Sequence, residues 1–298
     1  MPEQQELPRQ RPCRRTITIA KRRMYMKPID RNGLAGYNAG IEKGRLHRGL
    51  GLIEFERTKE ILLEELPKPP AVIYDIGGAY GEYAFWLASL GYEVSLFDLA
   101  EGHIRMAREL AETAPMPLKS AEVADARSID RPDASADAIL LFGPLYHIVD
   151  REERALCLRE CRRLLRPGGK LFTANITCYA TALKYTHLYD QRPVLDDDAY
   201  YRMIEATVRT GLHTGNEIGL VYFHKPEELH REVAASGFEE VELRGVIGPC
   251  WIIRNLEEAW PDPVKREAIM RIVRLLEREE SLIGLSTHLI SISHKPYE

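Results

Sequence analysis

The clearest hydrophobic pattern in the chain lies at residues 71–98, which read AVIYDIGGAYGEYAFWLASLGYEVSLFD. A short apolar run, Val72 to Ile76, leads into a glycine-rich turn and an apolar segment of helical length. A second apolar run, Val94 to Phe97, follows and ends at Asp98. Two strands joined through a helix form a right-handed unit in nearly all cases. The pattern therefore predicts a parallel sheet with helices on both faces.

Strand and helix patterns continue to the end of the chain. Helical spacing begins at Gly36 and stops at the proline pair Pro69-Pro70. Asp150 suits the N-cap of a later helix, whose buried side we assign to Leu156, Leu164 and Leu165, and Pro167–Gly169 should turn that helix into a strand. Further strands are predicted near residues 121–125, 136–143, 239–248 and 285–296. These patterns predict one domain, residues 36–298, with helical insertions at 177–222 and 251–284.

Charge is unevenly distributed along a chain whose net charge is only −4. Residues 1–31 hold nine Lys and Arg against three acids, so we interpret residues 1–35 as a basic arm that could meet RNA, an acidic partner or an anionic substrate, or could simply be a loosely docked terminus. Five cysteines without metal-type spacing favour free thiols in a reducing cytoplasm and predict no metal site. No apolar run approaches the roughly 18 residues of a membrane span.

The turn after the first strand has the chemistry of a nucleotide site. Gly77, Gly78 and Gly81 let the backbone come close to a ligand at a helix N-terminus, where free N–H groups favour an anionic group. Asp98, about 20 residues further on, could take both hydroxyls of a ribose. The glycine spacing differs from the G-x-G-x-x-G of dinucleotide sites, so a nicotinamide dehydrogenase is disfavoured. These residues predict a nucleoside-bearing cofactor.

The segment D-I-G-G-A-Y-G, residues 75–81, resembles motif I of the class I S-adenosylmethionine-dependent methyltransferases, of the small-molecule, UbiE-like type. Ala79 stands where that family usually has its middle glycine. The helix, L-R-P-G-G turn and strand after residue 150 resemble the post-motif region of the same family. The resemblance implies a Rossmann-like α/β fold, a seven-stranded sheet of order 3-2-1-4-5-7-6 with strand seven antiparallel, and S-adenosyl-L-methionine as cofactor.

The resemblance also assigns site residues. The cofactor-binding residues it implies are Asp75, Gly77, Gly78, Gly81, Asp98, Leu99, Asp125, Ala126, Phe142 and Tyr37. Asp125 would receive the adenine amino group, although an Asp there could equally cap the following loop. His147 is the candidate base and Tyr146 would orient the acceptor, whereas a capping or packing histidine is the plainer alternative. Residues 36–68 would form lid helices and residues 177–222 a substrate cap.

Three functions follow as hypotheses. The first is a cytoplasmic methyltransferase that moves a methyl group to an O, N or C atom of a small molecule, with nucleic acid an unlikely partner. The second keeps the enzyme but takes RNA as acceptor, guided by the basic arm. The third is a methyltransferase-like protein that binds a ligand or partner without turnover.

Overall fold

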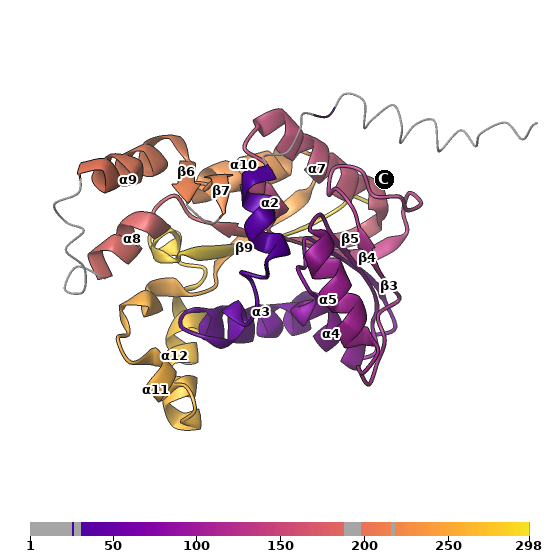
Figure 1. Cartoon of the computed structure of the whole chain (residues 1–298), viewed down its shortest axis with the longest axis horizontal. Coiled ribbons are helices and arrows are strands. Elements are labelled where there is room, and N and C mark those ends of the chain that lie inside the picture. Colours follow the sequence, from indigo (N-terminus) through magenta and orange to yellow (C-terminus); the bar gives the residue numbers. More distant parts are fainter. Residues whose placement is uncertain (1–25, 27–30, 188–197, 216–217, 298) are drawn as a thin grey trace, which may run out of the picture.

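The computed structural model describes Met26 and residues 31–187, 198–215 and 218–297. Within these residues, seven strands form the central sheet in the order β3-β2-β1-β4-β5-β9-β8 (Figure 1). The strands are β1 (Val72–Ile76), β2 (Glu93–Asp98), β3 (Ser120–Val123), β4 (Ala136–Phe142), β5 (Leu165–Ile176), β8 (Glu239–Gly245) and β9 (His288–His294). β9 runs antiparallel to both of its neighbours. The predicted fold class is confirmed. β6 (Leu212–Gly215) and β7 (Gly219–Tyr222) form a separate hairpin, so β8 and β9 are the sixth and seventh strands of the central sheet. Counted in this way, the order is the predicted 3-2-1-4-5-7-6.

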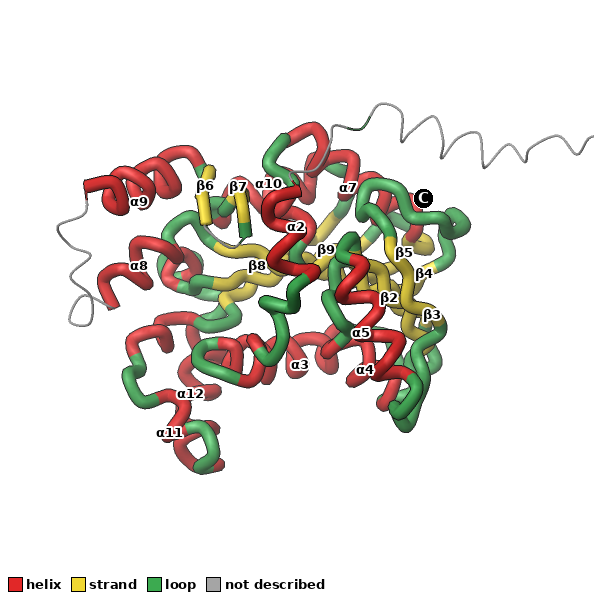
Figure 2. The backbone as a smooth tube through the Cα atoms, in the orientation of Figure 1, coloured by secondary structure: helices red, strands yellow, loops and turns green. Residues whose placement is uncertain are grey.

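Helices cover both faces of this sheet (Figure 2). Alternate strand residues point to opposite faces, so Ile73 and Leu140 pack under one helical layer and Ile76 and Leu141 under the other. The first layer is formed by α3 (Gly51–Glu65), α4 (Glu82–Ser89) and α5 (Glu101–Ala111). The second is formed by α7 (Arg151–Leu164) and α10 (Pro226–Ala235). The remaining helices are α2 (Arg31–Asn38), α6 (Pro144–His147), α8 (Ala180–His187), α9 (Asp198–Thr210), α11 (Leu256–Ala259) and α12 (Pro263–Leu276).

The helix after residue 150 shows where local patterns succeed and where they fail. The Asp150 side chain accepts hydrogen bonds from the backbone N–H groups of Glu152 and Glu153, as an N-cap does. Leu156 is only half-buried, so its assignment to the buried side was wrong. That side carries Cys157, Leu158, Cys161 and Leu164. The predicted turn at residues 167–169 instead lies inside β5, where the register with β4 shifts.

Two contacts fix helices at the edge of the sheet. Arg57 of α3 is buried and forms an ion pair with Glu277, just after α12, at 2.6 Å. α2, which begins at Arg31 rather than at Gly36, rests on α5 through Gly102, whose N–H donates to the Asn38 side-chain oxygen at 2.8 Å. A Cβ added to Gly102 would lie 2.6 Å from the Asn38 backbone oxygen, so only glycine permits this approach.

Some predicted features lie outside the described residues. The basic arm does so up to residue 30, apart from Met26, as do residues 188–197 and 216–217 of the predicted cap. Among the helices that the structure describes, none is long and apolar enough to cross a bilayer.

Candidate functional site

A large cavity lies at the carboxyl ends of β1, β2 and β4, beneath α2. Its empty space, with the open mouth included, amounts to about 1270 Å³. In open α/β sheets ligands bind at this edge, where the strand order reverses between β1 and β4. Ten of the twelve predicted site residues line the cavity: Tyr37, Gly77, Gly78, Asp98, Leu99, Asp125, Ala126, Phe142, Tyr146 and His147. The other two, Asp75 and Gly81, belong to the turn beneath it.

The glycine turn presents bare backbone to the cavity. Gly77 has φ 78°, and a Cβ there would lie 2.5 Å from the Pro144 ring. A Cβ at Gly78 would lie 2.3 Å from an Asp75 oxygen. Ala79 takes φ 51°, a left-handed conformation that disfavours residues with a Cβ. The turn is thus a cradle that side chains would fill, which fits the close approach of a nucleoside cofactor's amino-acid part.

Asp75 lies directly under this cradle and is fully buried. Neither of its carboxylate oxygens has a hydrogen-bond partner among the described residues. Burial, and then repulsion from Asp98, raises the pKa of Asp75 to about 7. A buried carboxyl without partners destabilises the empty protein, and a cationic group bound nearby would offset that effect.

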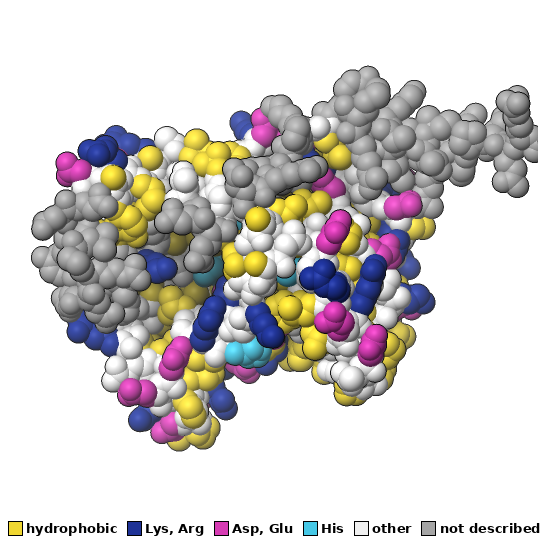
Figure 3. Space-filling view, viewed as in Figure 1, with side chains coloured by type: hydrophobic (Ala, Val, Ile, Leu, Met, Phe, Trp, Pro, Cys, Tyr) yellow, Lys and Arg dark blue, Asp and Glu magenta, His cyan; other side chains and the backbone are white. Residues whose placement is uncertain are grey.

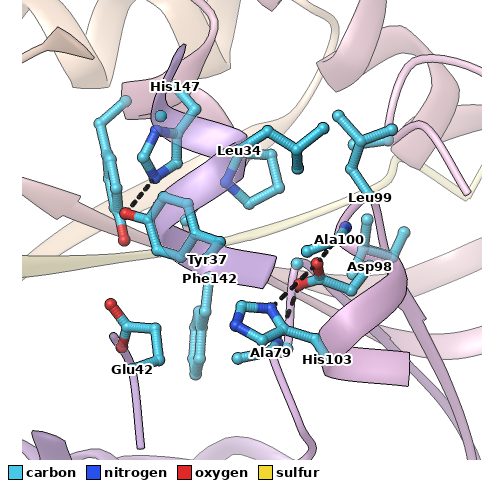
Figure 4. Close-up of a pocket in the computed structure, with 18 of the residues that line it drawn as sticks. Leu34, Tyr37, Glu42, Ala79, Asp98, Leu99, Ala100, His103, Phe142 and His147 are labelled. Atoms are coloured by element: carbon cyan, nitrogen blue, oxygen red, sulfur yellow. Dashed lines mark hydrogen bonds and ion pairs between the residues drawn. The ribbon is translucent and has the colours of Figure 1, made fainter. Parts of the chain in front are cut away.

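Asp98, at the end of β2, is held by three donors (Figure 4). Its Oδ2 accepts from the Ala79 N–H at 3.0 Å, and its Oδ1 accepts from the Ala100 N–H at 2.8 Å. The same Oδ1 lies 3.2 Å from Nδ1 of His103, a buried residue in the first turns of α5. The other ring nitrogen of His103, Nε2, has no hydrogen-bond partner within the described part of the chain.

Asp125 lines the cavity, but its oxygens are largely occupied. Its Oδ1 accepts from the backbone N–H of Arg127 at 2.9 Å, which is the loop-capping arrangement that the sequence left open. Its Oδ2 pairs with the Arg127 guanidinium at 2.6 Å. The adenine contact of Asp125 therefore stays a prediction, and few of its lone pairs remain for it.

Tyr37, Tyr146 and His147 form an aromatic cluster over the cavity. The Tyr37 hydroxyl and His147 Nε2 lie 3.0 Å apart, and Figure 4 shows Tyr37 reaching from α2 between His147 and His103. Burial lowers the pKa of His147 to about 4, against the opposing attraction of Asp98, so its ring is neutral near pH 7. Burial raises the pKa of the Tyr37 and Tyr146 hydroxyls well above the usual value, so both keep their protons.

A smaller side cavity of about 440 Å³ adjoins the large one. The two share a wall made of Arg45, Tyr83, Phe142, Gly143 and Tyr146. Beyond this wall the side cavity is lined by Glu54, Thr58, Ala174, Asn175, Val246, His288, Leu289 and Ile290. Asn175 Oδ1 is buried and has no partner among the described residues, so the chamber offers a free hydrogen-bond acceptor.

An ion pair crosses the side cavity. Two guanidinium nitrogens of Arg45 donate to the two Glu54 carboxylate oxygens at 2.6 and 3.0 Å. Burial alone would raise the pKa of Glu54, but Arg45 and then His288 lower it to about 2. Burial lowers the pKa of His288. The lining of the chamber therefore carries one fixed charge of each sign.

Sequence reasoning missed the residues that only the fold brings together: His103, Arg45, Glu54, Asn175 and His288. His103 had a weak signal, because it follows Asp98 by one turn of helix. Asn175 lies near the end of β5 and His288 begins β9, and no local pattern reports that these two strands pair. Across the described residues, no group of three or more His, Cys, Asp or Glu is arranged to hold a metal ion.

Comparison with known proteins agrees with this geometry. Residues 73–169 match a family model described as a methyltransferase domain. Over 184 residues the chain is 26% identical to the ubiquinone/menaquinone biosynthesis C-methyltransferase UbiE of Acidiphilium cryptum, covering 61% of this chain and 72% of that protein. It is 31% identical to the methyltransferase GfsG of Streptomyces halstedii, covering 42% of this chain and 45% of that one. A ubiquinone biosynthesis O-methyltransferase of Xanthomonas oryzae is 33% identical, with 38% and 47% covered.

Solved structures share the fold at low sequence identity. A methyltransferase of Methanosarcina mazei gives a TM-score of 0.52 at 20% identity, covering 80% of this chain and 98% of that one. A possible histamine N-methyltransferase of Thermotoga maritima gives 0.53 at 16% identity, covering 88% and 99%. The phosphoethanolamine N-methyltransferase 2 of Haemonchus contortus, with S-adenosylhomocysteine bound, gives 0.51 at 16% identity, covering 81% and 52%. The sequence matches, together with the sheet order and the glycine cradle, support the assignment of the chain as a class I S-adenosylmethionine-dependent methyltransferase with S-adenosylmethionine as cofactor.

Proposed function

We propose that the protein transfers the methyl group to an O, N or C atom of a small-molecule acceptor that binds in the side cavity. The observation that carries this proposal is that the two cavities adjoin, because Tyr83, Phe142 and Tyr146 line both of them. A donor and an acceptor in these two spaces would meet at the shared wall. Two of the relatives are named as methyltransferases of ubiquinone or menaquinone biosynthesis, which supports a small-molecule acceptor.

The residues then have three tasks. When bound, S-adenosylmethionine supplies a methyl carbon made electrophilic by a sulfonium. The shared wall must hold the acceptor atom in line with that carbon, and such positioning can contribute about 7 kcal/mol or more to barrier lowering. Asn175 and the Arg45–Glu54 pair would orient the acceptor's polar groups. α2 would exclude water, since Leu34 and Tyr37 cover the cavity.

An acceptor with an O–H or N–H also has to lose a proton. Tyr37 and His147 line the large cavity, so we propose that the acceptor atom reaches the methyl carbon there and that its proton passes to the Tyr37 oxygen as Tyr37 passes its own to His147 Nε2, 3.0 Å away. Burial lowers the pKa of His147 to about 4, so the ring is neutral near pH 7 and has a lone pair for the proton, but the same shift makes it a weak base. Tyr146, raised in pKa by burial, would act as a neutral hydrogen-bond partner of the acceptor.

The test separates binding from turnover. Calorimetry with S-adenosylhomocysteine should give a micromolar dissociation constant, and Asp98→Ala should weaken it while Asp130→Ala, at an exposed site, should not. Single turnover with methyl-labelled cofactor over a metabolite extract should place label in a small molecule. His147→Asn should slow that transfer by about a hundredfold or more and leave S-adenosylhomocysteine affinity unchanged. Absence of binding would remove the cofactor site, whereas binding without any label transfer would favour the non-catalytic alternative.

The RNA alternative depends on the basic arm, which lies outside the described residues up to residue 30 except for Met26. On the face shown in Figure 3, acidic and basic side chains of the described residues are interspersed over α3, α4 and α5. Nucleic-acid sites instead gather basic side chains into a patch or stripe. The small-molecule acceptor is therefore the function we propose.

A further inference from the structure

The hydrogen-bonding capacity of Asp98 is nearly used up inside the protein. A carboxylate has about four lone-pair positions, two on each oxygen. Oδ1 already receives the Ala100 N–H at 2.8 Å and faces His103 Nδ1 at 3.2 Å, and Oδ2 receives the Ala79 N–H at 3.0 Å. One position on Oδ2 is left. A ribose offers two neighbouring hydroxyl donors, so Asp98 held in this way has room for only one of them.

His103 has the complementary capacity. Its Nδ1 faces a carboxylate oxygen, so Nδ1 carries the proton and donates, which leaves Nε2 with a free lone pair. His103 is 2% exposed and lines the cofactor cavity, and its Nε2 has no partner within the residues that the structure describes. The rings of Tyr37 and Tyr80 pack edge-on against the imidazole, with 5.8 and 6.5 Å between ring centroids, and hold its orientation. A buried acceptor left unpaired in this way is the mark of a group that a ligand satisfies.

We infer that the cofactor's ribose is bound by two residues, with one hydroxyl donating to Asp98 Oδ2 and the neighbouring hydroxyl donating to His103 Nε2. This inference rests on the proposal that S-adenosylmethionine occupies the cavity. His103 is then a binding residue that reads a sugar hydroxyl, in addition to orienting the Asp98 carboxylate. The ligand class it selects is a nucleoside whose ribose carries both hydroxyls.

Calorimetry tests whether Asp98 and His103 each bind one ribose hydroxyl. The ligands are S-adenosylhomocysteine and its 2′-deoxy and 3′-deoxy analogues, and the proteins are wild type and His103→Phe. Wild type should bind each deoxy analogue about three- to tenfold more weakly than S-adenosylhomocysteine, since each lacks one hydrogen bond. His103→Phe keeps a ring of similar shape without nitrogen, so it should lose discrimination against one analogue and keep it against the other. His103→Gln, with an acceptor oxygen at a similar reach, should restore part of the lost discrimination.

If His103→Phe binds both deoxy analogues more weakly than S-adenosylhomocysteine, by the same factors as wild type, then His103 does not bind a ribose hydroxyl. The cofactor assignment would remain intact. Failure of wild type to bind S-adenosylhomocysteine at all would overturn both. If the Phe variant does not fold, the ¹⁵N resonance of His103 Nε2 in the wild-type protein decides the matter. That resonance should shift with S-adenosylhomocysteine and with only one of the two deoxy analogues, and a shift shared equally by all three ligands would overturn the inference.

Discussion

The Asp75 carboxyl under the glycine turn should make the ligand-free protein less stable as the pH rises. In the unfolded chain this group ionises near its ordinary pKa of 3.8, whereas in the fold burial and then Asp98 raise its pKa to about 7. Between these values the unfolded chain has released a proton that the folded chain still holds. Each pH unit in this window therefore lowers the free energy of unfolding by about 1.4 kcal/mol. Over the whole window the loss amounts to about 4 kcal/mol.

Asp75→Asn isolates this effect, because it keeps the side-chain shape and removes the ionisable group. The unfolding free energy of the variant minus that of wild type should increase by about 3 kcal/mol from about pH 5 to about pH 8. Urea unfolding without ligand measures both values. Asp130→Asn, at an exposed aspartate, serves as the control and should change by less than about 0.5 kcal/mol. A difference between Asp75→Asn and wild type that does not change with pH would refute the reasoning.

Ligand binding should lower the raised pKa of Asp75. A bound amino-acid part brings an ammonium group to the glycine turn, and a nearby cation favours the ionised carboxyl. S-adenosylhomocysteine binding to wild type near pH 6 should therefore release protons, which calorimetry in buffers of different ionisation enthalpy measures. Asp75→Asn should lose that release.

Two further predictions concern the backbone and the ion pairs. Ala79→Gly should raise the unfolding free energy by about 1 kcal/mol, because it removes a left-handed alanine, and Ala134→Gly, at φ 50° on the surface, should do the same. Stabilisation at residue 134 but not at residue 79 would show that the turn is not strained. Arg57→Met should cost about 3 kcal/mol in urea unfolding, because it leaves the buried Glu277 carboxylate without its cation, whereas Arg57→Met combined with Glu277→Leu should recover most of the loss. Equal stability of the single and double variants would contradict the assignment of that cost to Glu277.

The central sheet and the cavity floor were predictable because their signals are local. Short apolar runs identify β1 and β2, and glycines at residues 77 and 78 identify the turn that a ligand approaches. Contacts between distant segments carry no such signal. Nothing in the sequence tells that Tyr37 meets His147, or that Arg57 pairs with Glu277.

The side cavity illustrates the same limit on a larger scale. Its walls come from residues between 45 and 290, and only Phe142 and Tyr146 among them were candidates from the sequence. The prediction for residues 167–169 was wrong for the opposite reason. The local sequence there strongly indicates a turn, but the residues lie in β5 at a register shift. Pairing with β4 determines their conformation, and this pairing depends on the whole sheet.

Gly102 joins the cover of the cavity to its side wall. The helix that covers the cavity sits directly on this residue's backbone, and the next residue along the chain is His103. The contact that seats the cover and the imidazole that faces Asp98 are therefore one peptide unit apart. A side chain at residue 102 should therefore disturb the cover and the imidazole together.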